Sequence, residues 1–312
     1  MAKAIRDIYG ETLKEYGSTN KDIVVLDADV SGSSKSALFG AAYPERFYNC
    51  GIAEYAMTGI AAGMAKNGKI PFVNTFAVFL STLGSLGARL YMSYSGLNVK
   101  MMGAYGGLSD SYDGSTHHSL EDVAIMRALP GVTVMVASDS ATCRWMVQTA
   151  IEKKGPMYIR LSRDVAPDCH PVGAKFEYGK GFVVREGTDA AIIACGLMVS
   201  ESVAAAAQLE SEGVSVCIID LFCIKPIDRE IILKAARETG AIVTAEEHNV
   251  VGGLGSAVAE VLAEEAVGAP LERIGIQDCH AESGAYRDLL KKYKLDASAI
   301  IDAVKRVIKR KK

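Results

Sequence analysis

The chain has 312 residues, of which 49% are hydrophobic and 23% are charged, and its formal net charge is −3 at neutral pH. This composition excludes an intrinsically disordered chain, and the near-neutral charge gives no electrostatic reason to bind nucleic acid or an anionic membrane. The length exceeds that of a usual single domain, so two domains are the default expectation.

The seven cysteines are scattered along the chain, and no two of them form a CxxC pair. This pattern is typical of a reducing compartment and argues against a disulfide framework or a structural zinc site. The first residues carry charges where a signal peptide needs an apolar segment, and the uncharged stretch over residues 70–88 contains proline, asparagine and several hydroxyl side chains. We therefore expect a cytoplasmic protein without a membrane span.

Apolar patterns in the first half of the chain alternate between helical and strand periodicity. The patterns predict helices over residues 5–16, from 54 onward, 83–94 and 120–129, and strands over 23–26, 71–74, 99–102, 132–136 and 158–159. Such alternation predicts an α/β fold in which helices cover both faces of a parallel sheet. Ligands of such sheets bind at the carboxyl ends of the strands.

Residues 164–181 contain two prolines, three glycines and little periodicity, which indicates a linker. We expect His170, within it, at the surface. Beyond the linker the alternation resumes, with strands predicted over 190–194, 214–219, 241–245 and 273–276, and helices over 199–212, 228–238, 254–265 and 297–309. The predicted domains are therefore 1–168 and 182–312, joined by residues 169–181.

Two segments could carry chemistry. Glu54 is a lone carboxylate at the start of an apolar helical run; because burying a bare charge is costly, it either lies in water or shares a proton with a buried neighbour. His117 and His118 follow a glycine turn that begins at Asp113, where they could handle protons or be ordinary loop residues. No third ligand stands at a metal-binding spacing, so we expect no metal site here.

Four segments in order, CGIAE (residues 50–54), TFAVF (75–79), DGSTH (113–117) and LSR (161–163), resemble the pyrimidine-binding domain of transketolases. EEHN (246–249) and GGLGSAV (252–258) are similar to the transketolase C-terminal domain. The resemblance covers essentially the whole chain. It implies a thiamine-diphosphate-binding α/β fold, a parallel sheet with helices on both faces, followed by a second, smaller α/β domain.

The Gly-Asp-Gly motif, which holds the cofactor pyrophosphate and its metal in complete transketolases, does not occur in this sequence. The resemblance thus implies the C-terminal subunit of a split transketolase, which transfers a two-carbon ketol unit between sugar phosphates. A separate N-terminal subunit would hold the pyrophosphate and Mg²⁺ or Ca²⁺, and two copies of each subunit would form a heterotetramer.

The resemblance also implies roles for individual residues. Glu54 would bind the ring nitrogen of the thiamine aminopyrimidine, Phe79 would stack on that ring, and Phe76 would form a second wall. His117 would assist proton transfer at the substrate, and Asp113 would bind a sugar hydroxyl. Arg163, Arg6 and Ser33 would hold the sugar phosphate. Tyr105 stands where transketolases commonly carry a phosphate-contacting histidine, which leaves open a branched or sulfonated ketose as the donor.

Three alternatives remain open at this point. The beta subunit of a 2-oxo acid dehydrogenase shares the length, the two-domain order and the catalytic glutamate, but the DGSTH run favours ketol transfer. Deoxyxylulose-phosphate synthase shares that run, yet it normally carries the pyrophosphate domain in the same chain. A non-catalytic scaffold subunit is the third alternative, and the presence of Glu54, Phe79 and His117 argues against it.

Overall fold

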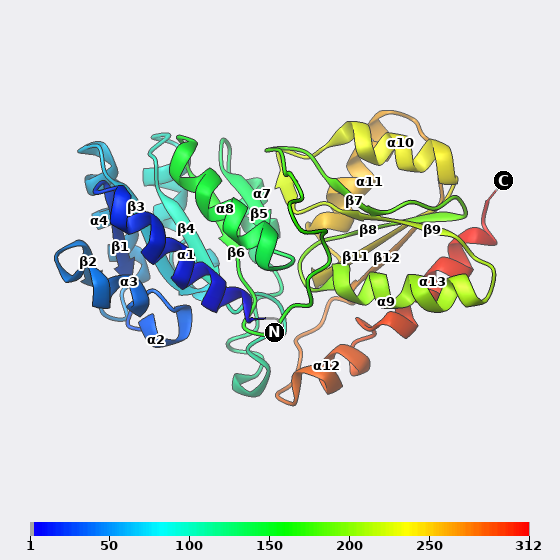
Figure 1. Ribbon diagram of the computed structural model, residues 1–312, viewed down its shortest axis with the longest axis horizontal. Coiled ribbons are helices and arrows are strands. Elements are labelled where there is room, and N and C mark those ends of the chain that lie inside the picture. Colours follow the sequence, from blue (N-terminus) through cyan, green and yellow to red (C-terminus); the bar gives the residue numbers. More distant parts are fainter. Residues whose placement is uncertain (1–2, 312) are drawn as a thin grey trace.

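The computed structural model describes residues 3–311, which form two α/β units side by side (Figure 1). The N-terminus lies between the units, and the C-terminus lies at the far end of the second one (Figure 1). Each unit is built around one sheet, of seven strands in the first unit and five in the second. The predicted α/β fold with two parallel-rich sheets is therefore confirmed.

The first sheet is parallel except at one edge, where its last strand comes from the second half of the chain. That strand, β10, pairs antiparallel with β5, whereas the other neighbours pair parallel. The strands in sheet order are β10 (Cys223–Lys225), β5 (Thr133–Val136), β6 (Met157–Arg160), β4 (Lys100–Ala104), β3 (Ile70–Phe76), β1 (Ile23–Asp27) and β2 (Phe47–Asn49). The domain boundaries predicted at residues 168 and 182 stay a prediction. β10 follows both boundaries in the sequence, yet it belongs to the first sheet.

Both faces of this sheet are covered by helices, because consecutive side chains of a strand point to opposite faces. Ile23 and Val25 of β1 pack with α1 (Ile5–Thr19) and α8 (Ser140–Glu152), which lie in front in Figure 1. Val24 and Leu26 pack on the other face with α4 (Glu54–Lys66) and α7 (Asp122–Ala128). The continuous apolar run of β1 is thus a strand buried on both sides, as predicted.

Short helical segments connect the strands of the first unit. The predicted helix over residues 83–94 is confirmed over residues 85–93, where an α-helical turn (Ser85–Gly87) continues without a break into a π-helical segment (Ala88–Ser93). Gly87 lets this segment pack closely against α4, since a Cβ atom at Gly87 would lie 1.8 Å from the Thr58 hydroxyl oxygen. The segments are α2 (Ser31–Ser34), α3 (Ala37–Ala42), η1 (Pro44–Arg46), α5 (Ala77–Thr82), α6 (Ser85–Gly87), the π-helical η2 (Ala88–Ser93) and η3 (Ser111–Asp113).

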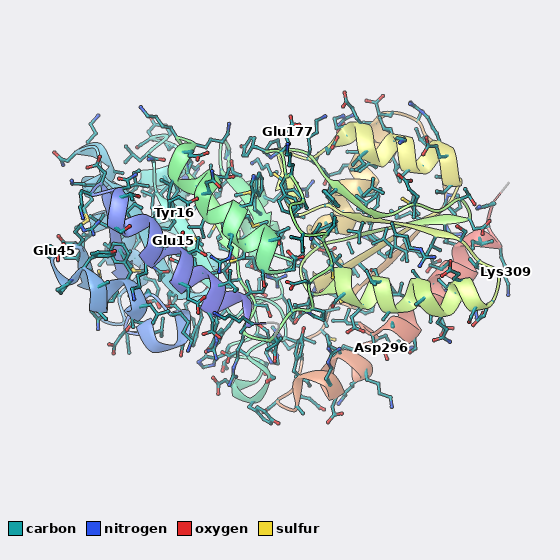
Figure 2. The ribbon with its side chains drawn as sticks, viewed as in Figure 1. Glu15, Tyr16, Glu45, Glu177, Asp296 and Lys309 are labelled. Atoms are coloured by element: carbon teal, nitrogen blue, oxygen red, sulfur yellow. The ribbon has the colours of Figure 1, made fainter. Side chains whose placement is uncertain are left out.

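The second sheet has the order β12 (Leu271–Ile276), β11 (Ile242–Asn249), β8 (Ala190–Ala194), β9 (Val216–Asp220) and β7 (Phe182–Arg185), and only β7 is antiparallel to its neighbour. Its helices are α9 (Met198–Ser211), α10 (Arg229–Thr239), α11 (Leu254–Glu264), α12 (Tyr286–Lys292) and α13 (Ala297–Ile308). Asp296 caps α13 by accepting the N–H of Ala299 at 3.1 Å, and Figure 2 shows Asp296 and Lys309 at opposite ends of this helix.

The predicted linker is irregular and mostly exposed or half-buried, except at Ala166 and His170. His170 is wrong as a surface residue, because its side chain is fully buried between the two units. Its Nδ1 lies 2.7 Å from the Asp139 carboxylate, which begins α8, and its Nε2 lies 3.5 Å from Asp220 at the end of β9. The linker therefore joins the units through a buried polar contact rather than as a flexible tether.

The sequence patterns missed several elements, chiefly α8, β10 and α12. The start of α8 carries a signal that would have found it, since Asp139 and Thr142 form a capping box. Among the helices within residues 3–311, none is long and apolar enough to cross a bilayer.

Candidate functional site

The carboxyl ends of the central strands of the first sheet define the candidate site. β1, β3, β4 and β6 are adjacent and parallel, so the segments that follow them meet at one edge of the sheet. The segment after β1 carries Ser33, β3 ends in Phe76, and the segments after β4 and β6 carry Tyr105 and Arg163. The fold therefore brings together residues that are far apart in the sequence.

Glu54 is the first residue of α4 and is only 4% exposed. The chain reaches it through Gly51, whose φ of +71° lies in the left-handed region that glycine adopts without strain. Thr75, in β3, donates a hydrogen bond of 3.2 Å from its hydroxyl to Glu54 Oε1. Of the two alternatives for this carboxylate, the structure favours the buried one.

Aromatic rings form a cluster beside this carboxylate. Phe76 stacks on Tyr105 with ring centres 4.7 Å apart, and it lies 5.8 Å from Phe79 in α5. The His117 imidazole meets the edge of both phenylalanines, at 5.9 Å from Phe76 and 5.2 Å from Phe79. Phe79 and His117 are half-buried, so the cluster offers ring surface to a ligand. Its members come from β3, α5 and the loop over residues 105–121, which we call the β4–α7 loop.

Two guanidinium groups lie over Tyr105 at the other end of the cluster. Their central carbons are 5.1 Å from the ring centre for Arg6 and 5.4 Å for Arg163. Arg6, in the first turn of α1, also donates to the Tyr105 hydroxyl and to the Ser33 carbonyl oxygen. Tyr105 itself has a φ of +60°, an uncommon backbone conformation that directs its ring between the two arginines. The arrangement concentrates positive charge at one point, as an anion site requires.

The β4–α7 loop carries a buried acid that sequence reasoning did not select. The Asp110 carboxylate is fully buried and lies 3.5 Å from the Arg163 guanidinium, while Asp113, three residues later, is exposed. Burial and the nearby charge of Asp113 raise the pKa of Asp110 to about 7, against the opposing effect of Arg163 and Arg6.

The neighbouring His118 was predicted together with His117, but the two differ in environment. The His118 side chain is buried, and burial lowers its pKa, an effect that the backbone of Ser111 opposes. Only His117 faces the aromatic cluster, with its Nδ1 3.0 Å from the Thr116 hydroxyl. The fold thus brings Glu54, Phe76, Phe79, Tyr105, Arg6, Ser33, Arg163, Asp113 and His117 to one edge of the sheet, and His118 turns into the protein.

Buried charged side chains also connect the two units near the end of β6. Arg160 at the end of β6 lies 3.1 Å from Asp122 and donates to the Glu247 carbonyl oxygen at 2.8 Å. Burial raises the pKa of the Glu247 carboxyl group to about 7, against the opposing charge of Arg160. The sequence patterns gave Arg160 and Glu247 no role, because their contact depends on how the two units pack against each other.

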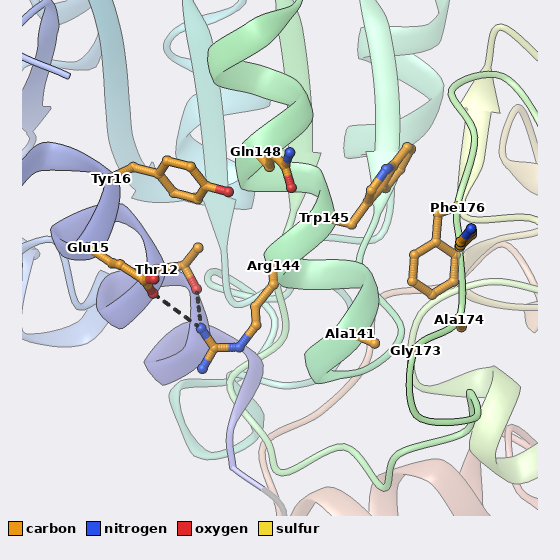
Figure 3. A pocket seen from close by; sticks show the side chains of 11 residues that line it. Thr12, Glu15, Tyr16, Ala141, Arg144, Trp145, Gln148, Gly173, Ala174 and Phe176 are labelled. Carbon is orange, nitrogen blue, oxygen red and sulfur yellow. Dashed lines mark hydrogen bonds and ion pairs between the residues drawn. The ribbon is translucent and has the colours of Figure 1, made fainter. Parts of the chain in front are cut away.

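A separate cavity lies elsewhere, in a groove between α1, α8 and the linker (Figure 3). It has a volume of about 620 Å³, and its walls include Trp145 and Phe176. Figure 3 shows the Arg144 guanidinium turned toward Glu15 and Thr12, at 3.8 and 3.2 Å. None of the site residues named above lines this groove. Within residues 3–311, no three His, Cys, Asp or Glu side chains are grouped as a metal site would require.

Comparison with known proteins accounts for both units. Residues 1–167 match the family described as "Transketolase, pyrimidine binding domain", and residues 179–300 match "Transketolase, C-terminal domain". The chain is 41% identical to the 6-deoxy-6-sulfo-D-fructose transketolase subunit of Clostridium sp. (strain MSTE9), over 98% of this chain and 95% of that one. It is 36% identical to an apulose-4-phosphate transketolase subunit of Phocaeicola vulgatus, over 98% of each chain.

A solved structure agrees with these relatives. The chain superimposes with a TM-score of 0.91 on "Split gene transketolase, inactive beta4 tetramer", at 44% identity and with 100% of both chains covered. The match extends over both units and their relative placement. This chain therefore belongs to the transketolase family, as a split subunit that comprises the pyrimidine-binding and C-terminal domains.

Proposed function

We propose that this chain is the C-terminal subunit of a thiamine diphosphate-dependent transketolase that transfers a two-carbon ketol unit from an anionic ketose to an aldose phosphate. The observation that carries the proposal is the buried Glu54 carboxylate, which lies next to Thr75 and an aromatic cluster at the edge of the sheet. The names of the split relatives, which act on sulfofructose and apulose 4-phosphate, support the ketol-transfer class over the alternatives.

The residues at this edge fit the aminopyrimidine of thiamine diphosphate. A buried carboxyl group near the half-buried phenyl ring of Phe79 suits a flat heteroaromatic ring with a nitrogen to be hydrogen-bonded. Glu54 would hold that nitrogen, Phe79 would stack on the ring, and Phe76 would be the second wall. When bound, the cofactor supplies the nucleophilic carbon that takes up the ketol unit and later releases it.

The polar residues of the β4–α7 loop would act on the sugar. His117 touches Phe79, so its imidazole is placed to give or take a proton at the donor carbonyl or hydroxyl group next to the cofactor ring. The exposed carboxylate of Asp113 would accept a hydrogen bond from a sugar hydroxyl. Both roles follow the resemblance and agree with the side of the loop that these residues occupy.

The far end of the donor would be an anion. Arg6 and Arg163 converge on Tyr105, and the Ser33 carbonyl oxygen is hydrogen-bonded to Arg6. A guanidinium binds phosphate or sulfonate oxygens in a fork. Tyr105 offers a neutral hydroxyl where the usual histidine could carry a proton, so we propose a phosphorylated or sulfonated ketose other than an ordinary pentose phosphate.

A partner subunit would complete the cofactor site. Beside Glu54, α4, α6 and η2 contact one another and expose a set of large apolar side chains that we call the apolar surface. These are Ile52, Tyr55, Ile60, Leu83, Leu86, Leu90 and Tyr94. Exposed apolar area of this kind marks a protein interface. We propose that a cytoplasmic N-terminal subunit covers it, brings Mg²⁺ or Ca²⁺ with the pyrophosphate, and forms a heterotetramer of two chains of each kind.

The experiment that tests the proposal mixes this chain with an N-terminal-type transketolase subunit, thiamine diphosphate and Mg²⁺. Transfer of a two-carbon unit to an aldose phosphate should require both chains. Donors to compare are xylulose 5-phosphate, a branched ketose phosphate and a sulfonated ketose, and a clear preference for xylulose 5-phosphate would end the proposal of an unusual donor. Release of carbon dioxide from a 2-oxo acid would instead support a dehydrogenase subunit, and failure of the pair to bind thiamine diphosphate would support a scaffold.

A further inference from the structure

The second α/β unit holds the β4–α7 loop from outside. This loop carries Asp113 and His117, and apart from the single turn η3 its backbone is irregular. The loop has backbone hydrogen bonds of its own, among them the pair between Gly107 and Ser119, and the second unit adds further contacts to these. Two groups of contacts reach it from the second unit, one from β11 and one from the segment before α12, which Figure 1 shows beside the loop.

Glu247 in β11 makes the first contact. Its Oε1 accepts the N–H of Leu108 at 2.5 Å, and its Oε2 accepts the hydroxyl of Tyr286 at 3.0 Å. Leu108 is fully buried, so this N–H needs a protein acceptor, and a carboxylate is a strong one. Gly107 has a φ of +68°, and a Cβ atom there would lie 2.5 Å from Glu247 Cδ. The loop therefore approaches the carboxyl group as closely as only glycine permits.

Arg160 fixes the other end of the loop to the same strand. Its Nη2 donates to the carbonyl oxygens of Ser119, at 2.6 Å, and of Glu247, at 2.8 Å. The guanidinium is buried, and Asp122 balances its charge at 3.1 Å. Both ends of the loop thus meet β11 through hydrogen bonds that water cannot replace.

Ser283 and Gly284 make the second contact, at the middle of the loop. The Ser283 hydroxyl donates to the Tyr112 carbonyl oxygen at 2.5 Å, and the N–H of Gly284 donates to the Ser111 carbonyl oxygen at 3.2 Å. These two bonds hold the turn that immediately precedes Asp113. The second unit therefore determines where the exposed carboxylate of Asp113 stands.

We propose that Glu247 and Ser283 are positioning residues for the donor ketose. By fixing Leu108 and Tyr112, on either side of Asp110, they set the place of the Asp110 carboxylate against Arg163 and the direction of Asp113. Both residues act on the loop through Leu108 and Tyr112, and the inference rests on the proposed function for the identity of the ligand. It gives the C-terminal domain a part in donor recognition.

The chain offers a matched control in Glu246, the preceding residue of the same strand. Its carboxylate also accepts two bonds, from the N–H groups of Leu254 at 2.6 Å and Gly255 at 2.8 Å, but these belong to α11. Glu246→Ala therefore removes acceptors from the same buried strand without touching the loop. Glu247→Gln keeps an amide oxygen for Leu108 and serves as the conservative variant.

The first measurement is hydrogen–deuterium exchange on the full chain, which needs no activity. Glu247→Ala should speed exchange in peptides that cover residues 105–121, whereas Glu246→Ala should speed it around residues 254–255 and leave the loop unchanged. Ser283→Ala should act on the loop in the same direction as Glu247→Ala. Unchanged exchange over residues 105–121 in both Glu247→Ala and Ser283→Ala would show that these two residues do not hold the loop, and would overturn the proposal.

The second measurement uses the holoenzyme assembled with the N-terminal subunit. Glu247→Ala and Ser283→Ala should raise the donor KM by about tenfold or more, because a small displacement of binding groups has large effects, while the Kd for thiamine diphosphate stays unchanged. Glu247→Gln should restore most of the donor KM, and Glu246→Ala should leave it near the wild-type value. An equal KM in Glu247→Ala and Glu246→Ala would overturn the positioning role. Absence of turnover in the wild-type pair would overturn the proposed function and the assignment of the donor. The exchange measurement would still show whether Glu247 and Ser283 hold the loop in place.

Discussion

The hydroxyl of Thr75 donates a hydrogen bond of 3.2 Å to the carboxylate of Glu54 and so joins the end of β3 to the start of α4. The bond holds the Glu54 carboxyl group at the residue that directly precedes Phe76 of the aromatic cluster. Such preorganisation is what a group that hydrogen-bonds a cofactor ring requires.

Glu54→Ala should lower turnover by about 10³-fold, within the range that removal of an acid–base group causes. The fold should stay intact, because the Thr75 hydroxyl can turn to another acceptor or to water that enters beside it. The measurement is steady-state turnover of the mixed holoenzyme, with circular dichroism as the check on folding. Unchanged turnover would refute the role of Glu54.

Arg163→Ala should raise the donor KM by about tenfold to a hundredfold, the equivalent of one lost charge-assisted hydrogen bond. The Kd for thiamine diphosphate should change much less, because Arg163 lies over Tyr105 and beside Asp110, whereas Glu54 is hydrogen-bonded to Thr75. Arg185→Ala is the control, since Arg185 pairs with Glu210 in the second unit. An equal loss of donor and cofactor binding would contradict an anion-binding role for Arg163.

The buried contact of His170 with Asp139 and Asp220 should make stability depend on pH. Burial alone would lower the pKa of His170, but its hydrogen bond with Asp139 and the nearby charge of Asp220 raise it. Burial also raises the pKa of Asp220 to about 7. A group with a raised pKa binds its proton more tightly in the folded state, so its stabilisation is present at lower pH and is lost as the pH rises through the folded pKa.

The free energy of unfolding should therefore fall as the pH rises above about 6.5 through the raised folded pKa of His170, and Asp220 should add a fall between about pH 4 and 7. His170→Gln should flatten the part of this dependence above about pH 7 while it destabilises the protein by about 3 kcal/mol at pH 6. Denaturant titrations at several pH values measure both effects. His280→Gln is the control, because His280 is exposed. A wild-type slope that survives in His170→Gln would assign the pH dependence to other groups.

Leu83→Glu should weaken association with the N-terminal subunit by at least about tenfold, because it places a charge in the apolar surface beside the cofactor site. Leu83 is 57% exposed, so the isolated chain should fold as before. Analytical ultracentrifugation of the mixed subunits gives the answer. Val203→Glu, on α9, tests a comparable exposed apolar side chain in the second unit and should leave association intact.

Local sequence patterns predicted much of the fold, because they record burial directly. The run over residues 23–26 had to be buried on both faces, and the resemblance of the ordered motifs predicted Glu54, Phe79 and His117 as members of one site. His170 could not be placed in this way, since its burial depends on Asp139 and Asp220, which only the assembled units bring to it. The part that Glu247 takes has the same origin, because it depends on the packing of β11 against a loop from the other unit.

Strand β10 affects the order in which the protein can mature during synthesis. When residues 3–160 have left the ribosome, six of the seven strands of the first sheet are present, and β5 is an open edge. An open edge invites pairing with other chains until Cys223–Lys225 emerge and cover it. The first sheet therefore cannot be completed until synthesis has passed residue 225 in the second half of the chain. A nascent chain that stalls between residues 160 and 223 is the form most in need of a chaperone.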